Sequence, residues 1–418
     1  MVVTLQQRDK NLAKRGKLLL MDEKMFRKLT VLTLEQATVV PYLTYRLAHD
    51  GMEVIRMENP GMPDPNRFIG ENRLNEKGMN TYFLSINAGK KAITLNLASP
   101  KGQEMLKDLI RKLDVDIFIT NQLPKNYQKL GVDYDILASA KKDLIWLGIT
   151  GFGPDSNEAA YDPILQARGG LMELTGEQEG NPMVVGIPLP DMGTSEHGYG
   201  LLMRALYKRA ITGEGSRIDL SMFESTVSWL TQPICLTKSF GNHISRRGNT
   251  HEFFAPVSVY PTKDSYVYIA VGNDRQWEAV TNLPAFQSLA KEEYKVNAGR
   301  INDVDNLNQA IEAITRQFNT DDLISLFNEA RVAISRVNNI QEVIADPIVQ
   351  QKVLCSRDGK TGTELTMAPP PFTSVFLDEQ KRTLSFPPRL GEHNEEIFCK
   401  SMGLSASEYA QLQEEKVI

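Results

Sequence analysis

The chain has 418 residues and carries 47 basic against 52 acidic side chains, which gives a net charge of −5. A nucleic-acid-binding protein is usually strongly basic, so this balance argues against nucleic acid as the partner. No apolar run is long enough to span a bilayer, which argues against a membrane protein. The basic first thirty residues lack the apolar core and cleavage site of a signal peptide, so we expect a cytoplasmic protein.

The three cysteines support the same compartment. Cys235, Cys355 and Cys399 lie far apart and form no CxxC pair, so neither a disulfide framework nor a zinc site is indicated. We expect them to be buried structural thiols.

From residue 29 onward, short apolar runs alternate with helical patterns. The sequence predicts strands at 29–34, 54–57, 92–97, 116–120 and 144–149, and helices at 41–49, 99–113 and 199–209. Strands that alternate with helices at this spacing form βαβ units, so we predict an α/β fold with a Rossmann-like, mostly parallel sheet. Ligands in such sheets bind at the carboxyl ends of the strands.

Four segments are predicted from these patterns. Residues 1–28 look like an N-terminal extension, and residues 29–240 form the large α/β domain. Residues 241–336 form a smaller α+β domain that contains a hairpin at 255–271, and residues 337–418 return to the large domain.

The stretch from 149 to 202 carries the chemistry. A proline-rich run, Ile187-Pro-Leu-Pro190, delivers Asp191 to the point where an extended segment becomes a helix. A carboxylate at this place meets the positive end of the helix dipole, which favours its ionised form. An aspartate there often does no more than cap the helix.

The surrounding motif resembles a known family. Tyr161-Asp162 stands before Gln166-Ala-x-x-Gly170-Leu-Met-x-x-Thr175-Gly176, and Pro190-Asp191 follows. This pattern resembles the family III CoA-transferases, the superfamily of formyl-CoA transferase and carnitine-CoA transferase, and the resemblance covers about residues 29–418. It implies that Asp191 is a nucleophile that forms an acyl anhydride and then an aspartyl-CoA thioester. It also implies an interlocked dimer, either of identical chains or with a homologous subunit.

The resemblance also implies a binding site for coenzyme A, which enters as a thioester substrate. The residues expected to line the pantetheine channel or approach the nucleotide are Gln36, Thr38, Val39, Asn59, Leu95, Asn121, Gln122 and Lys129. Asn59 and Lys129 stand where several relatives have arginine, so the phosphate contacts should differ. No GxGxxG or GxxxxGK[ST] motif is present, so we expect no dinucleotide cofactor, and we expect no metal.

Other residues are expected near the acyl group. The basic loop that contains Arg246, Arg247 and Gly248 corresponds to a mobile loop over the acyl group in relatives. Gly248 is the candidate backbone donor to an oxyanion. Arg246 and Arg247, with Tyr161, are candidate substrate contacts, and paired arginines suit a dicarboxylate. The donor, possibly succinyl-CoA, and the acceptor acid are not named by the sequence.

Two alternatives stay open. The acyl-CoA racemases of the same superfamily pair the aspartate with a histidine thirty residues upstream, where this chain has Tyr161. Tyrosine is a poor base at neutral pH, which favours the transferase, although His197 or His251 could substitute. The other alternative is a CoA-binding subunit of a two-subunit transferase.

Overall fold

The structure is a computed structural model, and it describes residues 29–369, 371 and 384–418. The predicted extension at 1–28 lies outside the described residues. The chain divides into two compact units. The first comprises the described residues of Met1–Gly169, Gly186–Gln232 and Lys352–Ile418, and the second comprises Gly170–Val185 and Pro233–Gln351. The domain boundaries after 240 and 336 stay a prediction.

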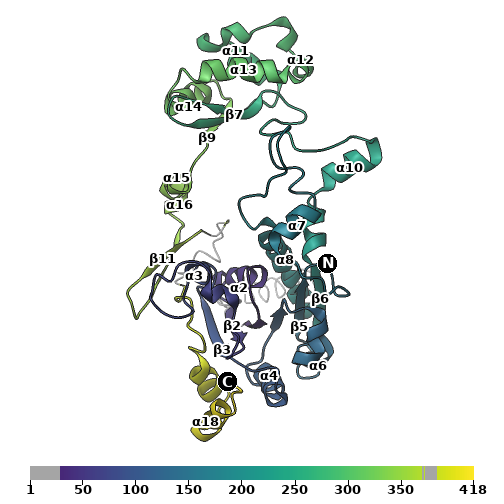
Figure 1. Ribbon diagram of the computed structural model, residues 1–418, viewed down its shortest axis with the longest axis vertical. Helices are drawn as coiled ribbons and strands as arrows, with labels where there is room; N and C mark the ends of the chain where they lie inside the picture. The colour runs from purple at the N-terminus through teal and green to yellow at the C-terminus, as the bar shows by residue number, and fades with distance from the viewer. Residues whose placement is uncertain (1–28, 370, 372–383) are drawn as a thin grey trace, which may run out of the picture. The chain divides into compact units, whose positions relative to one another are not determined.

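A six-stranded parallel sheet forms the centre of the first unit (Figure 1). Its strand order is β3-β2-β1-β4-β5-β6. The strands are β1 (Thr30–Leu34), β2 (Glu53–Glu58), β3 (Lys90–Thr94), β4 (Ile117–Thr120), β5 (Ile145–Thr150) and β6 (Ser216–Ser221). The predicted α/β fold with a Rossmann-like parallel sheet is confirmed.

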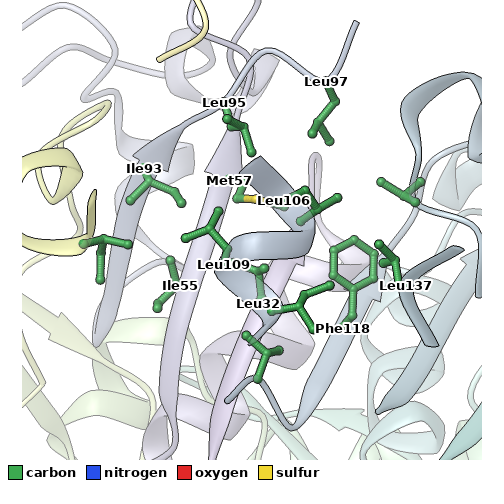
Figure 2. Packing of buried hydrophobic residues seen from close by; sticks show 14 of the residues in the cluster. Leu32, Ile55, Met57, Ile93, Leu95, Leu97, Leu106, Leu109, Phe118 and Leu137 are labelled. Atoms are coloured by element: carbon green, nitrogen blue, oxygen red, sulfur yellow. The ribbon is translucent and has the colours of Figure 1, made fainter. Parts of the chain in front are cut away.

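Helices cover both faces of this sheet because successive side chains of a strand point to opposite faces. On one face Val31 packs in a cluster with residues of α2 (Val39–His49) and α8 (Leu189–Thr212). On the other face Leu32 packs with residues of α4 (Pro100–Lys112). Figure 2 shows this second cluster, in which Leu106 and Leu109 of α4 lie over strand residues. Both faces are therefore apolar, as in most parallel sheets.

Shorter elements complete the first unit. Its helices are η2 (Pro65–Phe68), α3 (Thr81–Leu84), η3 (Pro124–Asn126), α5 (Tyr127–Leu130), α6 (Tyr134–Ala138), α7 (Asp162–Arg168), α9 (Met222–Ser228), the π-helix η6 (Glu395–Ser401) and α18 (Ala406–Glu414). A two-stranded antiparallel sheet joins β10 (Leu354–Arg357) to β11 (Glu364–Met367). The C-terminal residues Ile397 and Phe398 pack into the α4 cluster, so the end of the chain returns to this core.

The second unit holds a three-stranded antiparallel sheet, β7-β8-β9, with helices around one core. The strands are β7 (Val257–Pro261), β8 (Tyr266–Ala270) and β9 (Ala333–Arg336), and the pairing of β7 with β8 confirms the predicted hairpin. The helices are α11 (Asp274–Thr281), η4 (Pro284–Leu289), η5 (Glu292–Tyr294), α12 (Asn297–Asn302), α13 (Val304–Thr315), α14 (Thr320–Glu329), α15 (Ile340–Ala345) and α16 (Pro347–Gln350). The helix α10 (Thr231–Phe240) begins at the end of the first unit.

The prediction that the cysteines are buried is wrong, since Cys399 is half-buried and the other two are exposed. Cys235 and Cys355 are exposed, because α10 buries none of its residues and Cys355 lies on the solvent side of a two-stranded sheet. Among the described helices, none combines the length and apolarity needed to cross a bilayer.

Candidate functional site

The strand order identifies one place where a ligand can enter the sheet. The chain builds β2 and β3 on one side of β1, and then returns to place β4 on the other side. Connections leave the carboxyl ends of β1 and β4 in opposite directions, and such switch points are where open α/β sheets bind ligands. The segments that follow these two strands begin at Glu35 and Asn121.

Two of the predicted CoA-binding residues meet at this switch point. The Gln36 N–H donates to Asn121 Oδ1 over 3.2 Å, and Asn121 Nδ2 donates to the Gln36 carbonyl over 2.8 Å. The pair is 85 residues apart in sequence, so only the sheet topology brings it together. Gln36 is exposed, and these two bonds hold its backbone.

The next residues connect this segment to Asp191. Thr38 Oγ1 lies 2.9 Å from the hydroxyl of Tyr82. The carbonyl of Val39 lies 2.6 Å from Ser195 Oγ, and that hydroxyl also lies 2.8 Å from the carbonyl of Asp191. Ser195 has one hydroxyl proton to donate, so it alternates between the two carbonyls or shares the proton between them. The start of α2 and the first turn of α8 are thus adjacent.

Three further predicted CoA residues differ in how accessible they are to a ligand: Asn59 follows β2, Leu95 follows β3, and Lys129 lies in α5. Asn59 Oδ1 accepts the N–H groups of Gly61 and Met62 and so closes its own turn. The Leu95 side chain is buried in the core, which leaves only its backbone for a ligand. Lys129 is exposed.

Gln122 is the last member of this predicted set. It is half-buried, and its N–H donates to Thr120 Oγ1 over 3.2 Å. Its side chain therefore remains available beside Asn121.

Asp191 lies in the first turn of α8 and does not cap it. The N-cap is Pro188, and the helix has begun at Leu189. The Asp191 N–H donates to Asp162 Oδ2 over 3.1 Å, and Asp162 Oδ1 accepts from Gln166 Nε2 over 2.6 Å. The carboxylate of Asp162 therefore fixes the backbone of Asp191, while the Asp191 side chain is free for chemistry.

The electrostatics of Asp191 differ from the expectation that it stays ionised. Burial, and next the negative charge of Asp162, raise the pKa of Asp191 to about 7. The positive end of the α8 dipole favours the charged form but acts only over the first turn. Burial also raises the pKa of Asp162. At neutral pH Asp191 is therefore divided between its acid form and its nucleophilic form.

A glycine beside Asp191 makes room for an aromatic side chain. A Cβ atom on Gly193 would lie 1.5 Å from Cη2 of Trp229. Trp229 Nε1 donates to His197 Nε2 over 3.3 Å, so Nδ1 carries the proton of a neutral His197 and donates to Ser225 Oγ over 2.7 Å. Both ring nitrogens of His197 are engaged, which argues against this residue as a proton-exchanging base.

The two predicted arginine contacts belong to the second unit, where other groups engage them. Arg246 Nη1 lies 3.0 Å from both carboxylate oxygens of Glu173, and its Nε donates to the Gly180 carbonyl over 2.8 Å. Arg247 lies 3.4 Å from Glu252. A substrate carboxylate would have to displace these acidic partners.

The last predicted acyl-site residues differ in whether their polar groups are already hydrogen-bonded. Gly248 has φ +65°, and its N–H donates to the Gly176 carbonyl over 2.8 Å. That N–H is occupied, so Gly248 serves an oxyanion only after this bond opens. Tyr161 is 72% exposed, which keeps its ring available. His251 Nδ1 accepts the Phe253 N–H over 3.1 Å.

Comparison with known proteins decides the family. The family model described as CoA-transferase family III matches residues 27–394. The chain belongs to this family. The resemblance seen in the sequence is confirmed, and the protein is an enzyme whose family uses CoA thioesters as substrates.

Named relatives of this CoA-transferase cover most of its length. A mouse protein named succinyl-CoA:glutarate CoA-transferase is 30% identical over 88% of this chain and 84% of its own. A protein from Agrobacterium fabrum named succinate–glutarate CoA-transferase is 30% identical over 88% and 94%. Among solved structures, a CAIB/BAIF family protein from Brucella suis has a TM-score of 0.77 at 29% identity, over 89% of this chain and 98% of that one.

The sequence did not single out several residues that contact the Asp191 segment of this CoA-transferase. Asp162 was noted only as part of a motif, and Ser195 and Trp229 were not assigned a role. Gly193 was the one available signal, since glycine inside a helix costs stability unless close packing requires it. Within the described residues, no group of three or more histidine, cysteine, aspartate or glutamate side chains is arranged to hold a metal ion.

Proposed function

We propose that this CoA-transferase moves CoA from succinyl-CoA to a small carboxylic acid through covalent intermediates on Asp191. The observation that carries the proposal is the Asp191 carboxylate in the first turn of α8, on a backbone that the hydrogen bond from its N–H to Asp162 holds in place. The names of relatives support the donor, since they include succinyl-CoA transferases for glutarate, mesaconate and D-citramalate. An acid with a second carboxylate is therefore the acceptor class to test first.

The transfer needs no energy source because one thioester and one carboxylate are exchanged for another such pair. The Asp191 carboxylate attacks the donor thioester carbon, the C–S bond breaks, and CoA leaves as a thiolate while an anhydride forms. The thiolate attacks the aspartyl carbonyl, releasing the donor acid and leaving an aspartyl-CoA thioester. The acceptor carboxylate then attacks this thioester, its C–S bond breaks, and a second anhydride forms as CoA thiolate is released again. The thiolate returns to the acceptor's acyl carbon, which frees Asp191.

This sequence requires that the CoA thiolate stay bound throughout. Gln36, Thr38 and Val39 at the switch point are the proposed pantetheine contacts, because Ser195 hydrogen-bonds both the Val39 carbonyl and the Asp191 carbonyl and so joins this segment to the first turn of α8. The proposed contacts to the nucleotide are Asn59, Leu95, Asn121, Gln122 and Lys129. On the acyl side, Tyr161, Arg246, Arg247 and Gly248 remain proposed substrate contacts.

The experiment that tests the nucleophile is Asp191→Asn. It removes the charge with little change of volume, so CoA transfer from succinyl-CoA to glutarate should disappear while binding of free CoA persists. Hydroxylamine added to the wild-type enzyme with succinyl-CoA alone should trap Asp191 as a hydroxamate, detectable in a peptide digest. Transfer that persists in Asp191→Asn would place the nucleophile elsewhere.

The racemase alternative makes the opposite prediction about the α-carbon. A racemase exchanges the α-proton of a chiral acyl-CoA with solvent and needs no acceptor acid. With His197 held in one neutral tautomer and tyrosine at 161, we expect no deuterium uptake above the buffer rate. Rapid uptake without an acceptor would establish the racemase.

Assembly completes the proposal. We propose a cytoplasmic dimer, of identical chains or with a homologous subunit, whose interface is large and obligate. Exposed apolar side chains on short peripheral helices support it, among them Phe240 at 70%, Ile340 at 73% and Ile348 at 72% exposure. Sedimentation at nanomolar concentration should show no compact monomer. Activity that appears only with a co-expressed homologue would favour the two-subunit alternative.

A further inference from the structure

One residue of the switch-point segment has an unusual backbone. Ala37, between Gln36 and Thr38, has φ +61°. In this left-handed region the Cβ atom of any residue except glycine crowds the backbone, so alanine rarely adopts it. Such conformations persist only where the surroundings enforce them, and they concentrate at functional sites. The question is therefore what holds Ala37.

Two side chains at the start of η2, those of Asp64 and Asn66, hydrogen-bond the N–H and the carbonyl of Ala37. The Ala37 N–H donates to Asp64 Oδ1 over 3.2 Å, and the Ala37 carbonyl accepts from Asn66 Nδ2 over 2.5 Å. Asp64 Oδ1 also accepts the Asn66 N–H over 3.0 Å, which joins the two gripping residues into one unit. Asp64 is 3% and Asn66 5% exposed, so water does not replace these bonds.

The grip is anchored in a buried ionic cluster. Arg56 Nη2 donates to Asp64 Oδ2 over 3.0 Å, and the Arg56 side chain is fully buried. Arg56 also pairs with Glu58 at 3.2 Å and with Glu35 at 3.6 Å. Glu35 is in turn held by Lys90 at 3.0 Å. The residues on both sides of Gln36 are therefore tied to the same cluster, while Asn121 holds Gln36 itself.

We propose that Asp64 and Asn66 are positioning residues that lock Ala37 in the left-handed conformation and so fix Gln36 and Thr38 for the CoA thioester. The inference rests on the proposed role of Gln36 and Thr38 in binding CoA. If Ala37 relaxed to an ordinary φ, the chain direction would change between these two residues. The Gln36 backbone would then leave Asn121, and the pantetheine contacts would be lost together.

The test combines Asn66→Ala with Ala37→Gly and measures binding of free coenzyme A by calorimetry. Asn66→Ala removes one bond to Ala37 and leaves the ionic cluster intact. Without this bond Ala37 can relax to an ordinary φ, and CoA binding must then force it back into the strained left-handed conformation. The free energy of that strain should raise the Kd for CoA roughly tenfold. Glycine adopts φ near +60° without strain, so in the Ala37→Gly background the same change should raise Kd only about twofold. Ala37→Gly alone should raise Kd by less than Asn66→Ala does.

Asn80→Ala is the matched control. Asn80 Nδ2 donates to the Gly70 carbonyl over 2.9 Å in the same loop region, and Gly70 also has a positive φ. Its loss should not change the Kd for CoA. In the transfer assay, Asn66→Ala should raise KM for the acyl-CoA donor and leave KM for the acceptor acid unchanged, a split that general loss of structure would not produce.

The outcomes separate this inference from the proposed function. Equal loss of CoA affinity with and without Ala37→Gly, or no loss in Asn66→Ala, overturns the locking role while wild-type CoA transfer still stands. A wild-type enzyme that neither binds CoA nor transfers it overturns the proposed function itself. If Asn66→Ala fails to fold but the double variant with Ala37→Gly folds and binds CoA, the coupling is established by that rescue.

Discussion

Replacing Asp162 by asparagine isolates the electrostatic control of the proposed nucleophile. Burial, and then the charge of Asp162, raise the pKa of Asp191 to about 7, so only about a tenth of Asp191 is ionised at pH 6. Removing a neighbouring negative charge should lower that pKa by about one unit, to about 6, while burial keeps it above its ordinary value. Half of Asp191 would then be ionised at pH 6, about a fivefold gain relative to the plateau.

Asp162→Asn should also weaken a hydrogen bond that holds Asp191, and the same experiment detects this loss. The Asp162 carboxylate accepts from both Gln166 Nε2 and the Asp191 N–H, whereas an asparagine offers one oxygen for these two donors. The plateau value of kcat/KM should therefore fall, because Asp191 is less well positioned. The acid limb nevertheless moves to lower pH, so the two effects separate in one pH profile.

The assay is kcat/KM for succinyl-CoA from about pH 5 to about pH 9, which reports ionisation in the free enzyme. Glu158→Gln is the control, since it removes one negative charge from an exposed ion pair with Arg168. Its profile should match that of the wild type. An acid limb at the same pH in wild type and Asp162→Asn would refute the assignment of Asp162 as a cause of the raised pKa.

Two further substitutions test the packing and the buried charges. Gly193→Ala places a Cβ atom 1.5 Å from Cη2 of Trp229, so it should lower kcat more than tenfold and lower the melting temperature, and Trp229→Ala in the same chain should restore the melting temperature. Glu58 is buried, which opposes its ionisation, but Arg56 and Arg67 outweigh burial and lower its pKa from 4.5 to about 2. Its contribution is full above pH 4.5 and is lost as pH falls toward 2, so in urea unfolding Glu58→Gln should cost about 3 kcal/mol at neutral pH and about half of that near pH 3.

The sheet was predictable because strands buried on both faces read as continuous apolar runs. A buried charged residue interrupts the apolar run, so the run no longer marks the end of the strand. The third strand was expected at 92–97 but begins at Lys90, whose side chain is buried against Glu35. A lysine alone in a sequence reads as exposed, and only its partner 55 residues away reverses that reading.

The start of the helix after Pro188 was predicted wrongly for a different reason. Its start was expected near Asp191, with a clear helical spacing of small and apolar residues only at 199–209. The glycines at 193, 198 and 200 are poor helix formers. The helix begins at Leu189, since packing of Trp229 on Gly193 compensates for the low propensity. Because the helix begins two residues earlier than expected, Asp191 lies in its first turn and not at its boundary.

Contacts between residues far apart in the chain also limit what the sequence predicts about the site. Asp191 could be proposed as the nucleophile from the sequence because the residues that mark it are its near neighbours in the chain. Ala37 was not, because alanine is the strongest helix former and gives no sign of a left-handed backbone. Its conformation is imposed by Asp64 and Asn66, 27 and 29 residues later, which an ion cluster holds in place. A candidate catalytic residue can thus be identified from its neighbours in the sequence, whereas the proposed positioning of its substrate depends on contacts that only the folded sheet creates.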